Sequence, residues 1–111
     1  MAINDPTPFL DFRDSDAFDV VIIDAVADCV DDNTDVRVIL PDGRSYVATF
    51  FTIKNIERLL REYAANGECA FGQYFWSSEM IVIKSLDMSS IRTAVADLLR
   101  NGEFHKAFRK I

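Results

Sequence analysis

The residues of this chain that could perform chemistry are one histidine, two cysteines and many aspartates. His105 has no G-x-S-x-G serine motif to work with, so we expect it at the surface near the end of the chain. Cys29 and Cys69 form no C-x-x-C motif, and we expect both to be reduced, packed thiols. The four glycines are too few to supply a phosphate-binding loop in addition to turns and helix ends. These absences predict a protein that is not an enzyme and that holds no cofactor.

Carboxylates are abundant enough to suggest a metal site or an acid–base group. Four side chains have the spacing of ligands in an EF-hand loop: Asp31, Asn33, Asp35 and Asp42. That loop needs glycine at its sixth position, where Val36 stands, so we expect no metal site. Asp24, within the apolar stretch 20–30, is the best candidate for a general acid, although we expect it to face solvent. A small carboxylate-dependent enzyme therefore stays as an alternative.

The net charge of −6 is divided unevenly along the chain. Residues 1–42 contain eleven Asp and two Arg, whereas residues 43–111 contain ten Lys or Arg and seven acidic residues. Because an acidic half repels phosphates, we expect no nucleic-acid partner, and a basic protein would be attracted instead. The alternative is that the aspartates only cap turns and aid solubility. The candidate partner-binding residues from this pattern are Asp28, Asp31, Asp32 and Asp35.

The aromatic segment 71–76 is the most distinctive local feature of the sequence. If the segment is a strand, Tyr74 and Trp76 point to one side and Phe75 to the other. One set then belongs to the core, and the other is exposed unless the N-terminal residues cover it. Ordinary core packing is the simpler interpretation, but Tyr and Trp are also frequent anchors of protein interfaces. We therefore add Tyr74 and Trp76 to the candidate partner-binding residues.

The periodicity of the apolar residues predicts the elements that position these side chains. Alternation at period two predicts strands over about 18–30, 36–41, 45–51 and 71–84. Within the last of these, Ser77-Ser78 is either a tight turn or a kink. A period of 3.6 predicts helices over about 53–66 and 88–101. The order β-β-β-α-β-(β)-α predicts an α+β fold, with two helices packed on one face of a mainly antiparallel sheet of four to five strands.

Both predicted helices carry signals at their ends. Thr52 is the expected N-cap of the first helix, and either Asp87 or Ser89 that of the second. Asn-Gly-Glu follows both helices, and Gly67 and Gly102 are free to adopt the left-handed conformation that closes a helix. We interpret the repeated tripeptide as one C-cap solution used twice, because the flanking residues do not otherwise align.

The sequence predicts one domain preceded by a short arm. Residues 1–17 contain two Pro and four Asp and predict an extended N-terminal arm, and residues 18–111 predict a single α+β domain. No apolar run approaches the ~20 residues of a membrane span, so we expect no membrane association. No secretory signal pattern is visible at residues 1–5, and we therefore expect a cytoplasmic protein.

Two resemblances bear on function. The segment 74–83, which begins Y-F-W-S-S-E-M, and the helix end Gly102-Glu103-Phe104 resemble small uncharacterised bacterial proteins. Those proteins combine a Y-F-W-[AS]-S-[DE]-M segment with a helix that ends in G-E-F, and the likeness covers about the last forty residues. In size, acidity and lack of a catalytic set, the chain also resembles bacterial toxin-immunity proteins, including those of contact-dependent growth inhibition. The second resemblance is one of kind and implies no functional residue.

Together these features predict a non-catalytic protein-binding module. The specific expectation is a cytosolic immunity protein that neutralises a basic toxin domain, such as a nuclease, by occlusion. The candidate aspartates would form an electrostatic rim, and Tyr74 or Trp76 would be the anchor. The alternative is a homodimeric structural or scaffold protein that makes contact through an exposed strand edge or through the face of Trp76.

Overall fold

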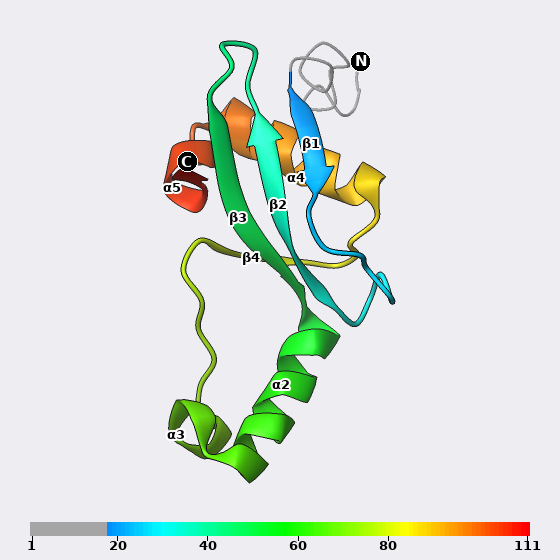
Figure 1. The fold of residues 1–111 in the computed structure, drawn as a ribbon, viewed down its shortest axis with the longest axis vertical. Helices are drawn as coiled ribbons and strands as arrows, with labels where there is room; N and C mark the ends of the chain where they lie inside the picture. The colour runs from blue at the N-terminus through cyan, green and yellow to red at the C-terminus, as the bar shows by residue number, and fades with distance from the viewer. Residues whose placement is uncertain (1–17) are drawn as a thin grey trace.

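The computed structural model of the protein describes residues 18–111, and Figure 1 shows a sheet with helices at one face and at one end. The strands are β1 (Asp19–Ile22), β2 (Asn33–Ile39), β3 (Ser45–Thr52), β4 (Met80–Ile83) and β5 (Arg109–Lys110). The helices are α2 (Ile53–Asn66), α3 (Glu68–Gly72), α4 (Met88–Asn101) and α5 (Phe104–Ala107). The α+β class and the β-β-β-α-β-α order are as predicted. The predicted arm at 1–17 lies outside the described residues.

Strand β3 is the centre of the sheet. On one side it pairs antiparallel with β2, which pairs antiparallel in turn with β1. On its other side, β4 pairs parallel with the second half of β3, and β5 pairs antiparallel with the first half. The β2–β3 turn is closed by the Gly43 N–H, which donates to the Leu40 carbonyl at 2.9 Å, and Gly43 has the φ of 88° that such a turn leaves to glycine. The sheet is therefore mainly antiparallel, as expected.

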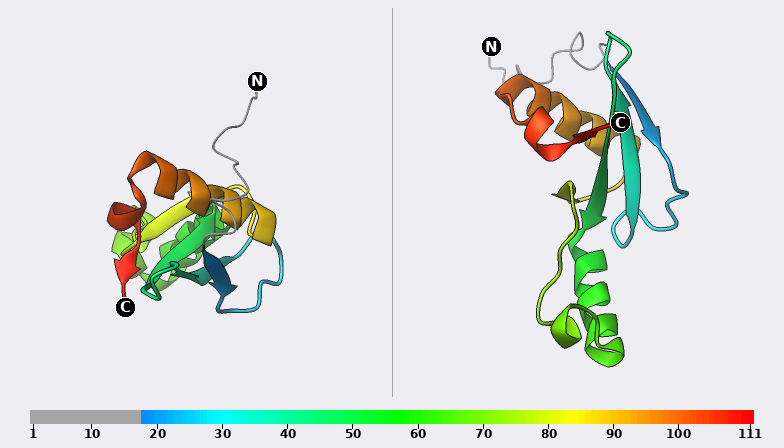
Figure 2. Two further views of the ribbon diagram at one scale, coloured as in Figure 1. Left: turned by 90° about the horizontal axis from the view of Figure 1, so that it is seen from above. Right: turned by 60° about the vertical axis from the view of Figure 1, so that its left-hand side comes forward.

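The core lies between one face of the sheet and α4, and no helix of residues 18–111 covers the other face (Figure 2). Alternate side chains of β2 and β3 point into this core, as the period-two pattern predicts. Phe104 and Phe108 stack with ring centroids 4.5 Å apart, so the short elements α5 and β5, which periodicity did not predict, close the core at one end. The large side chains with almost no exposure are Val36, Val38, Phe50, Leu86, Ile91, Val95 and Phe104.

Helix α2 does not pack on the sheet, although we expected both helices on one face. It extends past the end of the sheet, and α3 lies against its far end (Figures 1 and 2). The reason is the connection: Thr52 is both the last residue of β3 and the N-cap of α2. Without intervening residues the chain cannot turn back over the sheet, so the helix continues away from it. We call residues 53–79 the α2–α3 projection.

Two predicted strands are much shorter in the structure. β1 ends at Ile22, and residues 23–32 form a loop, because aspartate carboxylates there accept hydrogen bonds from backbone N–H groups that a strand would use. β4 covers only the last part of the predicted strand 71–84, because residues 73–78 run back from α3 toward the sheet without pairing with a strand of residues 18–111. Ser78 and Glu79 form a turn directly before β4, as one of the two alternatives predicted, but no strand precedes this turn, so it is not the turn of a hairpin.

The predicted helices and their ends are confirmed. The Thr52 side chain accepts a hydrogen bond from Asn55 N–H, and Asp87, not Ser89, does the same for Ser90 N–H. Gly67 and Gly102 are left-handed C-caps with φ of 89° and 82°. Within residues 18–111, none of the helices has both the length and the apolar character needed to cross a bilayer.

Candidate protein-binding site

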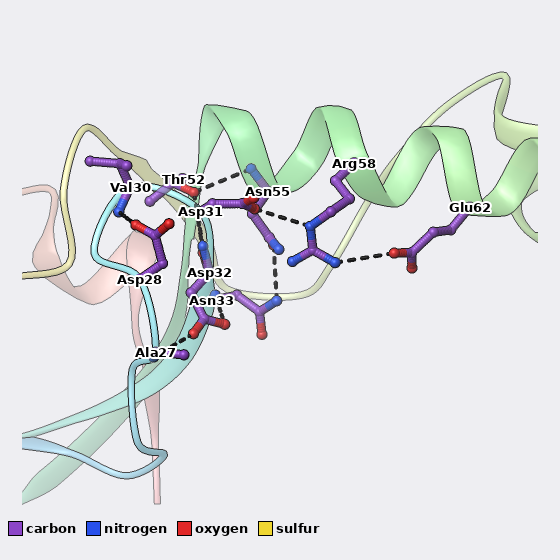
Figure 3. Close-up of polar contacts among 10 residues, drawn as sticks. All are labelled: Ala27, Asp28, Val30, Asp31, Asp32, Asn33, Thr52, Asn55, Arg58 and Glu62. Atoms are coloured by element: carbon purple, nitrogen blue, oxygen red, sulfur yellow. Dashed lines mark hydrogen bonds and ion pairs between the residues drawn. The ribbon is translucent and has the colours of Figure 1, made fainter.

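Three of the four candidate aspartates lie beside the base of α2, namely Asp28, Asp31 and Asp32 (Figure 3). Asp28, Asp31 and Asp32 lie in the loop of residues 23–32 between β1 and β2, which we call the acidic loop, and Asp35 lies on β2. The structure thus brings three of them into one loop with the fourth beside it. Each of the four carboxylates also makes a contact within the chain, so their role in folding has to be separated from any role in binding.

Asp32 holds the acidic loop in shape. Its carboxylate accepts hydrogen bonds from the N–H of Ala27 at 2.9 Å and from the N–H of Asn33 at 2.8 Å (Figure 3). These two backbone donors, that of Ala27 first, hold the pKa of Asp32 below its ordinary value. Both carboxylate oxygens are occupied, so this residue serves the fold first.

Asp31 ties the acidic loop to α2. Its Oδ1 lies 3.1 Å from Nε of Arg58, and Nη1 of the same arginine lies 3.1 Å from Oε2 of Glu62. The hydrogen bond and charge of Asp31, and then those of Glu62, raise the pKa of Arg58 above its ordinary value. This pair offsets part of the negative charge of the loop on the side that faces the helix.

Asp28 and Asp35 make simpler contacts. Asp28 is exposed, and its Oδ1 accepts a hydrogen bond from the N–H of Val30 at 3.0 Å. Asp35 accepts a hydrogen bond from the hydroxyl of Thr49 at 2.6 Å across the β2–β3 pair. In both residues only Oδ1 is used by these bonds, so the charge is presented outward more freely than in Asp32.

A buried polar contact that sequence reasoning missed fixes the base of α2. Asn55, with 1% of its surface exposed, accepts a hydrogen bond at Oδ1 from Nδ2 of Asn33 at 2.9 Å. Thr52 Oγ1 accepts from the N–H of Asn55 and from the N–H of Asp32, both at 3.2 Å. Only the neighbouring Thr52 N-cap hinted at this in the sequence. The network joins the helix, the sheet and the acidic loop at one point.

In the aromatic segment, Tyr74 and Trp76 lie on one side and Phe75 on the other, as the alternation predicts. The two residues on the outer side are highly exposed. Trp76 is 67% exposed and Tyr74 is 52% exposed, so ordinary core packing is wrong for both. Phe75 faces inward: its ring lies 5.0 Å from that of Phe51, edge to face, and 6.3 Å from that of Tyr63, stacked (centroid distances). Phe75 therefore packs the segment against β3 and α2, while its two neighbours are exposed to solvent.

The turn α3 adds a third exposed aromatic residue, Phe71, at 65% exposure. The residues Cys69, Ala70 and Phe71 all have left-handed φ, between 49° and 58°, which costs ~1–2 kcal/mol for each L-residue. Gly72 lies so close to α2 that a Cβ there would meet the carbonyl of Leu60. The absence of a Cβ at Gly72 therefore allows this strained turn to lie directly against the helix backbone. The sequence gives no signal for it beyond the two glycines that bracket the turn.

The acidic and aromatic residues lie on different sides of α2. Asp31 contacts the helix through Arg58, and Phe75 contacts it through Tyr63. Five residues separate these two helix positions, which corresponds to about 140° around the axis. The structure therefore does not join the six candidates in one contact surface. It provides exposed aromatic residues on one side of α2 and a negatively charged loop on a side about 140° away around the helix axis.

The candidates for catalysis and metal binding do not gather into a site. Asp24 is exposed, so it lacks the apolar surroundings that would make it a general acid. His105 is also exposed and lies edge-on to the ring of Tyr46. Cys69 is half-buried, and Cys29 is exposed, which corrects the expectation of a packed thiol. Within the part of the chain that the structure describes, no three His, Cys, Asp or Glu residues lie together as metal ligands would.

Comparison of the chain with known proteins identified no relative. No family model matches the chain. No curated protein and no solved structure is significantly similar to it. The resemblances of the Y-F-W segment and of the acidic composition therefore depend on the residues of this chain alone.

Proposed function

We propose that the protein is a non-catalytic protein-binding module, and specifically a cytoplasmic immunity protein that neutralises a basic toxin domain by occlusion. The observation that carries this proposal is the pair Tyr74 and Trp76, exposed on either side of the anchored Phe75. Aromatic side chains exposed on a fixed backbone are the residues that most often supply binding energy at protein interfaces. Phe71, on the turn α3 of the same projection, is a third exposed aromatic residue.

The acidic loop supports a basic partner. It contains no basic residue and four aspartates: Asp24, Asp28, Asp31 and Asp32. Among these four, only Asp31 forms an ion pair with an arginine within residues 18–111. A loop of this charge accelerates the approach of a basic surface, and such steering acts over about 8–10 Å at physiological ionic strength. The aspartates therefore contribute without touching the partner, which fits their position on a different side of α2 from the aromatic residues.

The acidic loop and the aromatic residues would act in two successive steps of binding. Charge on the acidic loop orients the encounter, and burial of Tyr74 and Trp76 then holds the complex. Electrostatics acts mainly on the association rate, and the aromatic anchors act mainly on the dissociation rate. A toxin whose basic active surface binds nucleic acid would be blocked by such a cover.

Adjacent residues provide a matched pair of variants for the test. Trp76→Ala should leave the free energy of unfolding within about 0.5 kcal/mol, because the side chain is exposed, and should weaken binding by about 2 kcal/mol or more. Phe75→Ala should instead destabilise the fold by about 1–3 kcal/mol, because its ring packs on Phe51 and Tyr63. Chemical denaturation and titration calorimetry separate the two effects.

The partner to test is the product of the reading frame beside the gene for this chain. Co-expression should restore growth that this product inhibits, and Trp76→Ala should abolish the protection.

A triple variant tests the role of charge: Asp28→Asn, Asp31→Asn and Asp35→Asn. Each asparagine retains an Oδ1 acceptor, so the variant should keep its fold. It should associate with the partner more slowly than the wild type, and its association rate should depend less on salt concentration. If no neighbouring product is toxic, or if a toxic one is not neutralised, the immunity function is wrong. Salt-independent binding would refute the steering role alone.

A further inference from the structure

The chain has a single tryptophan, Trp76, and it lies in the aromatic segment of the projection. Exposure alternates from residue to residue over 74–78, which is the pattern of an extended backbone. Tyr74 and Trp76 therefore point to the same side. Within residues 18–111, neither ring forms an aromatic pair or a cation–π contact. With more than half of each side chain exposed, both rings are accessible to a ligand.

The part of the chain around these rings carries acidic residues only. Residues 62–83 contain Glu62, Glu68 and Glu79 and no lysine or arginine. Glu62 is paired with Arg58, and Glu79 is paired with Arg109. The carboxylate of Glu68 forms no ion pair within residues 18–111. Its charge is therefore available to a cation supplied by another molecule.

Glu68 places negative charge next to the aromatic segment. Burial, and then the charge of Glu68, raise the pKa of the Tyr63 phenol above its ordinary value. The ring of Tyr63 in turn stacks on that of Phe75, which lies between Tyr74 and Trp76 in the chain. The negative field of this glutamate thus reaches the segment that carries the exposed rings. A cation is favoured there, and an anion is disfavoured.

We propose that Tyr74 and Trp76 bind an arginine side chain of the partner, with the planar guanidinium group between the two rings. This inference rests on the proposed protein-binding function and names the group that its aromatic residues recognise. Aromatic faces attract cations, and tryptophan does so most strongly. Arginine fits better than lysine, because a guanidinium group is planar and more weakly hydrated than an ammonium group. The two side chains leave the backbone roughly 6.5 Å apart, close to the ~7 Å that a flat group in contact with a ring on each side requires.

The single tryptophan allows a direct test in solution, because the intrinsic tryptophan emission comes from Trp76 alone. The probe is a tetra-arginine peptide with blocked ends, titrated at about 0.15 M salt so that attraction to distant charges is screened. It should change the emission of Trp76 saturably, and a tetra-lysine peptide should bind about two- to fivefold more weakly. A tetra-citrulline peptide has nearly the same shape without the charge and should produce no saturable change.

Substitutions of Tyr74 separate recognition by an aromatic ring from simple apolar contact. Tyr74→Phe keeps the ring and should bind the arginine peptide as the wild type does, whereas Tyr74→Leu should bind it about two- to fivefold more weakly. Glu68→Gln should also weaken binding, because it removes the nearby negative charge. Asp97→Asn is the charge control: it lies on α4, which packs on the sheet away from the projection, and it should leave binding unchanged (Figure 1). Circular dichroism confirms that each variant folds.

Equal emission changes with the arginine and citrulline peptides would overturn the proposal. So would equal binding of the arginine peptide by Tyr74→Phe and Tyr74→Leu, because the rings would then act only as apolar surface. These outcomes are distinct from those that decide the immunity function. If the peptide binds as expected but no neighbouring product is neutralised, the arginine site stands and the immunity function is wrong. If a toxin is neutralised but binds Tyr74→Phe and Tyr74→Leu equally well, the immunity function stands and the arginine site is wrong.

Discussion

Helices α2 and α4 are alike in their local features and differ in what they bury. Each has fourteen residues, an N-cap side chain that accepts a hydrogen bond three residues ahead, and a left-handed glycine at the C-cap. Yet α4 buries Ile91, Val95 and Ala96 against the sheet, whereas the only buried residue of α2 is the polar Asn55. Local signals thus decide where a helix begins and ends, and the preceding connection decides which surface it reaches.

The apolar stripe of α2 is covered by its own projection and not by the core. Tyr63 contacts Phe75, and Gly72 approaches the backbone of Leu60, so the turn α3 and the segment 73–79 supply the contacts that a sheet supplies to α4. An isolated helix of this length is marginal in water. The projection is therefore expected to open more readily than the core, and a bound partner would stabilise it.

The largest expected difference between the two helices is in the cost of removing an isoleucine. Ile91 is fully buried in α4, so Ile91→Ala should lower the free energy of unfolding by about 2–5 kcal/mol. Ile53, in the first turn of α2, is 60% exposed, so Ile53→Ala should change it by no more than about 0.5 kcal/mol. Urea unfolding curves measure both. If the two variants lowered the free energy of unfolding equally, Ile53 would be buried in solution, and α2 would pack against another part of the protein.

A smaller difference is expected between the stability costs of replacing two glycines with alanine. Gly72 and Gly102 both have positive φ, but a Cβ at Gly72 would meet the Leu60 carbonyl, whereas a Cβ at Gly102 would meet nothing within 4 Å. Gly102→Ala should therefore cost about 1 kcal/mol for its conformation alone. Gly72→Ala should cost more and should release α3 from α2, with loss of amide protection in both by hydrogen exchange. Similar costs for the two variants would show that the close approach at Gly72 contributes nothing.

The bounds and caps of both helices were predictable from the sequence, because the signals that begin and end a helix are local. The 3.6 period, Thr52 and the two Asn-Gly ends predicted both helices with the observed bounds. The position of α2 was not predictable from its stripe, because an apolar stripe does not say what covers it. It follows from the direct passage of β3 into α2 at Thr52, which the sequence also contains but which only the pairing of β3 makes evident.

The candidate site was predictable only in part, for the same reason. Alternation correctly separated Tyr74 and Trp76 from Phe75, although the segment is not a strand, because an extended backbone alternates whether or not it pairs. The aspartates were predicted as surface charge, but the backbone bonds of Asp32 and the ion pair of Asp31 require a folded loop and a helix distant in sequence. Phe71 was missed as an exposed residue because the left-handed turn has no sequence pattern of its own.

The smallest difference between the helices lies in how their N-caps respond to pH. The cap of α4 is the carboxylate of Asp87, and the hydroxyl of Ser85 first, then the N–H and hydroxyl of Ser90, hold its pKa below the ordinary value of 3.8. Because the folded-state pKa is lowered, the contribution of this cap is complete above pH ~4 and is lost as the pH falls through the folded value. The cap of α2 is the hydroxyl of Thr52, which does not titrate in this range.

The expected result is that acid loosens the first turn of α4 before that of α2. The amide signal of Ser90 should shift with the titration of Asp87, while that of Asn55 should follow it only weakly, and NMR spectra from pH 6 to pH 2 record both. Asp87→Asn is the control, since it caps without titrating and should flatten the response of Ser90. Asp32 also titrates with a lowered pKa near the base of α2, so the difference between wild type and Asp87→Asn isolates the cap. If Ser90 shifts equally in both proteins, another carboxylate controls the start of α4, and the contrast between the two caps is wrong.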